Sequence, residues 1–195
     1  MLARYARLKT YRDHGVLRVW RADDRQPLEM PFETLFEAPA RFRFEFHYPH
    51  PAPRQPATRY VVGSDGRTPY LLTVYPEARP DLRTFTTLGR AVAAASGVSC
   101  GCAHTIARLL LPDVRGASLA ELDALERRGT MEVRGTRCAR LVGRHPYAGE
   151  LELSIGDDGL LHRLVKQSAG MTVEELREAI ETDAAIGAAQ FAQPS

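Results

Sequence analysis

The clearest pattern in the chain is the alternation of apolar and polar residues over positions 40–48, ARFRFEFHY. Alternate side chains of a β-strand point to opposite faces. One face of this segment therefore carries four aromatic side chains: Phe42, Phe44, Phe46 and Tyr48. Charged or polar residues occupy the other face. The pattern predicts a strand with one apolar and one solvated side.

A period of two recurs in further segments, bounded by Gly, Pro and Asp residues. These predicted strands are 16–22, 31–36, 58–63, 69–76, 130–135, 136–145, 149–156 and 160–167. Asp-Gly turn signals occur in SDGR at 64–67 and in IGDDGL at 155–160. The strands form two groups, which predicts antiparallel meanders on either side of a central helical insert.

Three segments have apolar residues at helical spacing. Residues 3–13 predict a short amphipathic helix that stops at Gly15, and residues 88–96 predict a helix with Thr86 or Thr87 as its N-cap and Gly97 after its end. Residues 104–111 predict a second central helix closed by Pro112. Its apolar side carries Ile106, Leu109 and Leu110.

Two more segments carry capping boxes, in which Ser or Thr precedes Glu by three residues. They are Ser118 with Glu121, and Thr172 with Glu175. Propensity alone therefore favours helices over 118–127 and over 172–183.

Length and composition predict a single domain spanning residues 1–195, since 195 residues at 44% hydrophobic content suffice for one sizeable core. No run approaches the roughly 18 apolar residues of a membrane-spanning helix. The 26 basic residues are scattered among 24 acidic ones, with a net charge of +2. A nucleic-acid binder concentrates its positive charge on one face, so nucleic acid is not an expected partner.

The segment 97–112, GVSCGCAHTIARLLLP, contains most of the candidate chemistry. Cys100, Cys102 and His104 with Cys138 form a conceivable zinc set, but C-x-C is tighter than the usual zinc spacing. A disulfide from Cys138 to either Cys100 or Cys102 is favoured over zinc in an oxidising compartment; otherwise the cysteines are small buried apolar residues.

Ser99 and His104 are the weak candidates for nucleophilic catalysis, because the chain has no G-x-S-x-G elbow. A helix-capping role for the region of His104 and Thr105 is the simpler interpretation. No dinucleotide or Walker signature occurs. The prediction is therefore no catalytic residue, no metal and no cofactor.

The aromatic stripe of residues 42–48 has two interpretations. It is ordinary core, or it lines an apolar cavity between a curved sheet and its helical cover.

Five segments in this order resemble the LolA/LolB-like lipoprotein-carrier superfamily, in a branch of predicted periplasmic bacterial proteins of unknown function. They are YRDHGVL, FETLFEAPARFRFEFHY, GVSCGCAHTIARLLLP, RRGTMEVRGTRCARLVG and ETDAAIGAAQF. The resemblance extends over nearly the whole chain.

The resemblance implies an α+β fold: a strongly curved antiparallel β half-barrel, with a short N-terminal helix and a central helical insert covering the concave face. It also implies strands at 124–133 and 176–183 in place of the helices that propensity favours, and a terminal packing segment containing Phe191. Members of the superfamily are exported, so a signal sequence is expected ahead of residue 1. Carriers of this type hold the acyl chains of lipoproteins in their cavity.

The resulting prediction is a periplasmic, non-enzymatic protein that binds a hydrophobic ligand such as a lipid or an acylated protein. Phe42, Phe44, Phe46 and Tyr48 are the expected lining residues, and Leu109 and Leu110 the expected lid contacts. The alternative is an envelope interaction or sensor domain with a filled core, in which an exposed segment such as residues 49–56 contacts a protein partner.

Overall fold

The computed structural model describes residues 1–50, 52, 54–111, 113–168 and 170–193. It contains one open antiparallel sheet with the strand order β6-β5-β4-β3-β2-β1-β11-β10-β9-β8-β7. The strands of the first half are β1 (Thr10–Arg21), β2 (Leu28–Glu37), β3 (Arg41–Tyr48), β4 (Thr58–Asp65), β5 (Pro69–Val74) and β6 (Asp81–Thr84). Those of the second half are β7 (Asp123–Val133), β8 (Thr136–His145), β9 (Gly149–Gly156), β10 (Leu161–Ser168) and β11 (Met171–Thr182).

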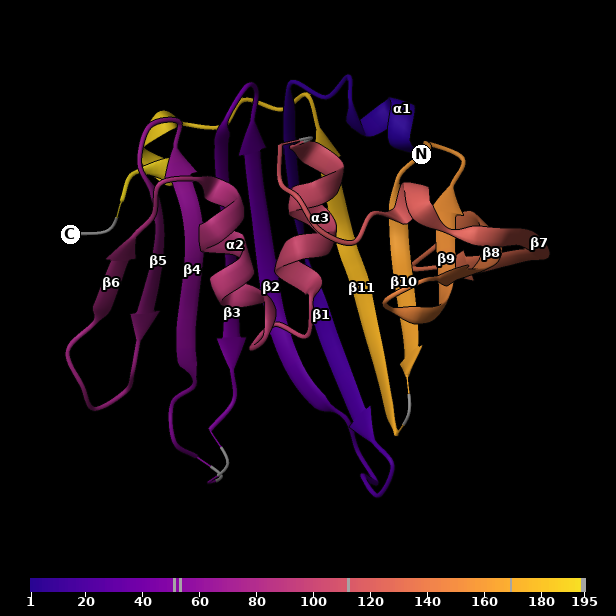
Figure 1. Cartoon of the computed structure of the whole chain (residues 1–195), viewed down its shortest axis with the longest axis horizontal. Coiled ribbons are helices and arrows are strands. Elements are labelled where there is room, and N and C mark those ends of the chain that lie inside the picture. The colour runs from indigo at the N-terminus through magenta and orange to yellow at the C-terminus, as the bar shows by residue number, and fades with distance from the viewer. Residues whose placement is uncertain (51, 53, 112, 169, 194–195) are drawn as a thin grey trace.

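Two central helices cover one face of this sheet, which we call the concave face (Figure 1). They are α2 (Leu88–Ser96) and α3 (Cys102–Leu110). A short helix, α1 (Leu2–Tyr5), lies beside the upper end of the sheet, and two 3-10 turns, η1 (Leu119–Glu121) and η2 (Ala188–Phe191), complete the elements. The predicted α+β half-barrel with a central helical insert is confirmed.

The first and last strands of the chain join the two meanders. β1 pairs with β11 over nearly its whole length, from Tyr11 opposite Thr182 to Arg21 opposite Met171. The first and last strands of the chain therefore lie side by side near the middle of the sheet (Figure 1), and we call this pairing the seam. Among the described strands, this is the pair that links the two halves of the sheet.

The apolar core lies between the concave face and the helices. Ala91, Val92 and Ala95 of α2 are fully buried in the same cluster as the aromatic residues of β3. Phe44 lies between two ring neighbours, with centroids 5.7 Å from those of Phe32 and Phe46. Small buried residues allow α2 to lie close over β4 and β5, beside these rings, which is how a well-packed interior is built.

The opposite, convex face carries a continuous row of ion pairs that crosses six strands. Neighbouring members lie 2.5–3.2 Å apart. In strand order from β8 to β2, the row is Arg140, Glu152, Arg163, Glu174, Arg18 and Glu29. Opposite charges on adjacent strands favour one register, so the row supports the same strand alignment as the core beneath it.

The structure corrects the helix predicted over residues 3–13. α1 ends at Tyr5, and β1 begins at Thr10. Tyr11 and Asp13 are fully buried at alternate positions of β1, so tertiary packing on the concave face overrides the helical spacing of the apolar residues.

The structure also shows that propensity misassigns the two capping-box segments. Ser118 accepts a bond from the amide of Ala120, but only the three-residue turn η1 follows before β7 begins. Residues 171–182 form β11. The strands and the buried Phe191 implied by the resemblance are confirmed. Strand β6 was not predicted, because all four of its residues are exposed and give no alternating pattern.

The seam contains one position that requires glycine. β1 has a register shift between His14 and Gly15, and a Cβ atom added at Gly15 would lie 2.0 Å from the carbonyl oxygen of Leu176 and 2.8 Å from the ring of Phe32. The close approach of β11 at this bulge leaves no room for a side chain.

We therefore expect Gly15→Ala to lower the free energy of unfolding by about 1–3 kcal/mol, the usual cost of overpacking. Gly97→Ala is the control, because Gly97 has right-handed helical backbone angles and no heavy atom within 4 Å of an added Cβ. Urea unfolding of both variants measures the difference, and equal stability of the two would contradict the assignment.

Candidate functional site

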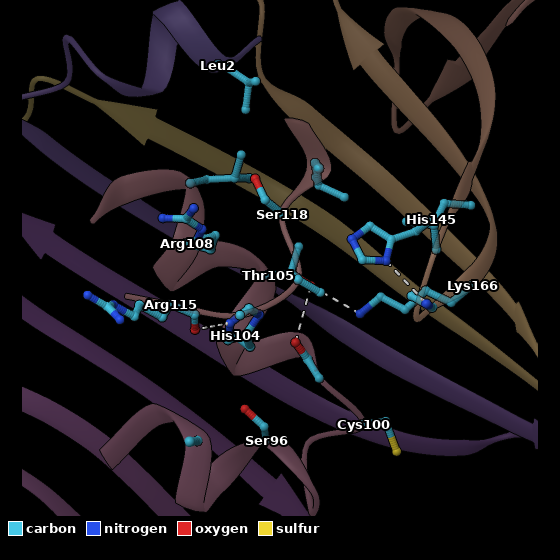
Figure 2. A pocket seen from close by; sticks show the side chains of 18 residues that line it. Leu2, Ser96, Cys100, His104, Thr105, Arg108, Arg115, Ser118, His145 and Lys166 are labelled. Atoms are coloured by element: carbon cyan, nitrogen blue, oxygen red, sulfur yellow. Dashed lines mark hydrogen bonds between the residues drawn. The ribbon is translucent and has the colours of Figure 1, made fainter. Parts of the chain in front are cut away.

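A cavity of about 470 Å³ opens between α3, the segment 115–119 and the ends of β8, β9 and β10 (Figure 2). Its apolar wall includes Leu2, Leu109, Leu119, Ala148 and Leu151. Ala93 and Ser96 of α2 contribute on the other side. The volume lies within the range of about 300–1,000 Å³ typical of small-molecule sites.

The polar part of the cavity wall is one-sided in its charge. Five of the lining side chains are basic: His104, Arg108, Arg115, His145 and Lys166. None of the described residues that line the cavity is Asp or Glu. A wall that is largely apolar with several basic groups and no acid suits a ligand that is apolar along most of its length.

His145 is the most deeply buried of these basic residues, with 2% of its surface exposed. It ends β8, and its Nδ1 accepts hydrogen bonds from the amides of Tyr147 and Ala148 at 3.1 and 3.2 Å. Because Nδ1 is an acceptor, the neutral ring carries its proton on Nε2. That Nε2–H has no hydrogen-bond partner within the described ranges; the nearest carboxylate oxygen is Glu121 Oε2 at 3.5 Å.

A buried ionic network lies beneath α3, at the seam. Arg177 Nε donates to Asp13 Oδ2 at 3.1 Å and Nη2 donates to Glu175 Oε2 at 3.4 Å, with all three side chains fully buried. Lys166 Nζ donates to Glu175 Oε1 at 2.5 Å. We call Asp13, Lys166, Glu175 and Arg177 the seam network. Two cations and two carboxylates balance within it.

The seam network also attaches α3 to the sheet. The hydroxyl of Thr105 lies 2.9 Å from Glu175 Oε1 and 3.1 Å from Lys166 Nζ, and it is also within hydrogen-bond distance of the Gly101 carbonyl. Lys166 reaches the cavity wall at the same time. The network therefore fixes one wall of the cavity relative to the seam.

The environment shifts the pKa of both carboxylates in the network, in opposite directions. Burial acts to raise the pKa of Glu175, but Lys166 and Arg177 together outweigh burial and leave that pKa below its ordinary value. Burial raises the pKa of Asp13, and the nearby Arg177 only partly offsets this. Glu175 is thus the carboxylate that the network stabilises in its charged form.

Of the six residues predicted to bind the ligand, the structure brings one to the cavity; Cys100, a candidate for the disulfide, also lines it. Leu109 lines it, whereas Phe42, Phe44 and Phe46 are fully buried in the core beneath the helices. Tyr48 is half-buried and packs against that core, and Leu110 is buried within it. Contact of the five residues outside the cavity with a ligand stays a prediction.

The predicted disulfide is not formed, and all three cysteines are free. Cys102 is buried in the main core on the concave face, whereas Cys138 packs with Val133 and Leu176 in a separate cluster. Leu176 lies opposite Val16 at the seam, one position from the buried pair Leu17 and Glu175. The separate cluster is therefore on the convex face, and the sheet lies between the thiols.

The other chemistry considered for residues 97–112 is not assembled. The Ser99 hydroxyl is bonded to the Ser96 carbonyl and the Ala103 amide, and the His104 ring to the Arg115 carbonyl. The N-cap of α3 is Gly101, which has no side chain to bond the helix, and both His104 and Thr105 lie inside the helix, which corrects their predicted capping role. Closure by Pro112 lies outside the described residues.

The cysteines also lack the properties of metal ligands or nucleophiles. Burial raises the pKa of the Cys100 thiol and raises that of Cys102 further, so both are protonated at neutral pH and unreactive. No group of three or more His, Cys, Asp or Glu side chains in the described part of the chain is arranged to hold a metal ion.

Sequence reasoning missed His145, Arg115 and Lys166 as cavity residues. Lys166 gave the only signal, because it is one of two lysines, with Lys9, in an arginine-rich chain. His145 gave none, since its buried orientation depends on the turn formed with Tyr147 and Ala148.

The comparisons with known proteins show that this chain is similar in fold to several solved structures. No family model matches the sequence, and no curated protein matches it. Among solved structures, MucB in the Pseudomonas aeruginosa MucA/MucB complex is similar to this chain, with a TM-score of 0.52 and 14% identity over 99% of this chain and 58% of the other. This chain thus spans less than two thirds of MucB.

Two mycobacterial proteins match over nearly their whole length. The lipoprotein LppX of Mycobacterium tuberculosis has a TM-score of 0.53 and 12% identity, covering 96% of this chain and 93% of its own. LprF of Mycobacterium bovis has a TM-score of 0.51 and 10% identity, covering 100% and 93%. These similarities confirm that the chain has the LolA-like fold.

We expect Glu175→Gln to lower the free energy of unfolding at pH 7 by about 3 kcal/mol, because it leaves two buried cations with one carboxylate. Glu178→Gln is the control: its partner Arg134 and Glu178 itself are both well exposed, and such a surface pair contributes about 1 kcal/mol or less. Urea unfolding at pH 7 measures both, and an equal loss in the two variants would contradict the central role of Glu175.

The comparison of the wild type with Glu175→Gln should also depend on pH. Since the folded-state pKa of Glu175 is lowered, its charge stabilises the fold above the ordinary carboxyl pKa, and this contribution is lost as pH falls through the folded-state value. The stability difference between the wild type and Glu175→Gln should therefore shrink as the pH is lowered from 5 towards 3, about the range of carboxyl titration. A difference that grows over this range would refute the assignment.

Proposed function

We propose that this chain is a non-enzymatic protein of the bacterial periplasm that binds a hydrophobic ligand, a lipid or an acylated protein, in the cavity beside α3. The observation that supports the proposal most is the cavity itself, with its apolar wall of Leu2, Leu109, Leu119 and Leu151. The LolA-like fold supports the same class of function.

The size of the cavity limits the cargo. A volume of about 470 Å³ lies in the lower half of the range for small-molecule sites. We therefore infer that the cavity holds one acyl chain rather than several. Each buried methylene contributes about 0.8 kcal/mol. A single long chain therefore supplies enough free energy for useful affinity.

The resemblance to exported lipoprotein carriers supports a periplasmic location. None of the helices in the described ranges has the length and apolar character needed to cross a membrane. The free thiols are compatible with an oxidising compartment because Cys102 is fully buried and separated from Cys138 by the sheet.

A protein-interaction role is the second candidate. It is supported by the filled aromatic core of β3 and by the likeness to MucB, whose structure was determined in complex with MucA. In this role an envelope protein is the partner. The segment 49–56 predicted to contact it includes residues 51 and 53, which lie outside the described residues.

Native mass spectrometry of the protein purified from a periplasmic extract, followed by organic extraction, tests the binding proposal. We expect a bound species of several hundred daltons that extracts as lipid. A ligand-free mass that persists after incubation with phospholipid and an acylated peptide would contradict the proposal; stoichiometric recovery of one envelope protein would then support the second candidate.

Two neighbouring alanines of α2 locate the site. Ala93 and Ala94 are both exposed, but only Ala93 lines the cavity. We expect Ala93→Trp to weaken binding of the neutral hydrophobic dye N-phenyl-1-naphthylamine at least about tenfold, because the indole fills the cavity, and Ala94→Trp to leave it unchanged. Fluorescence titration measures both. Equal affinities in the two variants would place the dye elsewhere.

A further inference from the structure

The basic groups of the cavity wall differ in whether the protein already neutralises them. Lys166 is paired with Glu175, and Arg108 has an interaction within the protein. The guanidinium of Arg115, on the exposed segment that follows α3, has no ion pair or hydrogen bond with any residue in the described part of the chain. Positive charge therefore remains available on this wall.

The second observation is the Nε2–H of His145. A buried donor without a partner costs roughly 1–3 kcal/mol, and this one is held in position by two amide bonds to the opposite ring nitrogen. Figure 2 shows the ring on the cavity wall, across from α3. The fold thus fixes a hydrogen-bond donor beside an apolar space whose described lining residues include no Asp or Glu.

We propose that the cavity selects single-chain amphiphiles with an anionic head, a carboxylate or a phosphate, whose oxygen accepts the hydrogen bond of His145 Nε2–H while the chain lies along Leu109, Leu119 and Leu151. Arg115 contributes electrostatic attraction to the head. This inference rests on the proposed function and narrows it to one ligand class.

The head chemistry separates two sources of acyl chains. A chain attached to a protein through an ester or amide ends in a neutral group, whereas a fatty acid or a phosphorylated lipid ends in an anion. The unpaired positive charge of the wall favours the anion, because a charge-assisted hydrogen bond is about twice as strong as a neutral one.

Glu121 competes for the same donor. Its Oε2 lies 3.5 Å from His145 Nε2, and its side chain is half exposed in the turn η1. The anionic head of a ligand would approach this carboxylate and be repelled by it. Removal of the Glu121 charge should therefore strengthen the binding of an anion, the opposite of the effect of removing the His145 donor.

The test compares three probes with the same sixteen-carbon chain: palmitate, hexadecyl phosphate and hexadecanol. Each displaces N-phenyl-1-naphthylamine from the wild-type protein in a fluorescence titration. We expect at least one anion to bind about tenfold or more tightly than hexadecanol. The tighter of the two anions identifies the head as carboxylate or phosphate.

Three variants locate the head. His145→Asn keeps an acceptor oxygen at the position of Nδ1 and removes the Nε2–H; it should weaken the preferred anion about tenfold and hexadecanol by less, because the hydrogen bond to a neutral hydroxyl oxygen is the weaker of the two. Glu121→Gln should tighten the anion severalfold. Arg115→Gln should weaken the anion and reduce the salt dependence of binding, whereas Arg137→Gln, an exposed arginine outside the cavity wall, should have no effect.

The outcomes distinguish failure of the anion selectivity from failure of the proposed hydrophobic-ligand function. Equal binding of palmitate, hexadecyl phosphate and hexadecanol would overturn the anion selectivity and leave the proposed hydrophobic-ligand function standing. Binding of none of the three would overturn both. Should His145→Asn fail to fold, judged by urea unfolding, Glu121→Gln still decides: an unchanged or weaker affinity for the anion would refute the position of the head beside His145.

Discussion

The seam between the first and last strands depends on a set of buried charges that is stable only when complete. Arg177, Asp13 and Glu175 are fully removed from solvent, and burying charges costs several kcal/mol for each ion unless they are paired and hydrogen-bonded. β1 supplies Asp13, and β11 supplies the other two. The charges are therefore satisfied only in the register that the structure adopts, and a seam shifted by one residue would expose or isolate them.

The same constraint sets the position of the helical cover. Glu175 uses both carboxylate oxygens for cations, and Thr105 of α3 binds the oxygen that also pairs with Lys166. On the other side of α3, α2 lies over β4 and β5, and its fully buried residues Ala91, Val92 and Ala95 belong to the same apolar core as the aromatic rings of β3. The concave face thus has an apolar, filled half under α2 and a polar attachment under α3. The cavity lies beside that attachment, where α3 and the segment 115–119 face the ends of β8, β9 and β10.

Sequence patterns were sufficient for the elements whose local signal agrees with the tertiary structure. The aromatic alternation of residues 42–48 and the turn of residues 64–67 gave β3 and the β4–β5 hairpin, and the fold followed from the resemblance. The helix expected over 3–13 does not form because tertiary contacts hold this segment as a strand. Asp13 accepts a hydrogen bond from Arg177, far along the chain, and another from the hydroxyl of Tyr11, which lies on the same face of the strand. The site could be predicted less well from the sequence. Its chemistry depends on the orientation of His145 and on the position of Arg115 opposite the ends of β9 and β10, and no local sequence period encodes either.

The distribution of acidic residues between the two faces explains how an arginine-rich chain of near-zero net charge can present a basic cavity. On the convex face Glu152, Glu174 and Glu29 each lie against arginine in the row of ion pairs. At the seam, Glu175 pairs with Lys166 and Arg177, and Asp13 pairs with Arg177. With these carboxylates committed, the segment 115–119 and the end of β8 contribute basic groups to the cavity with no acid among the described lining residues. The local field at the cavity therefore arises from where the acids are placed, and the overall charge of +2 gives no indication of it.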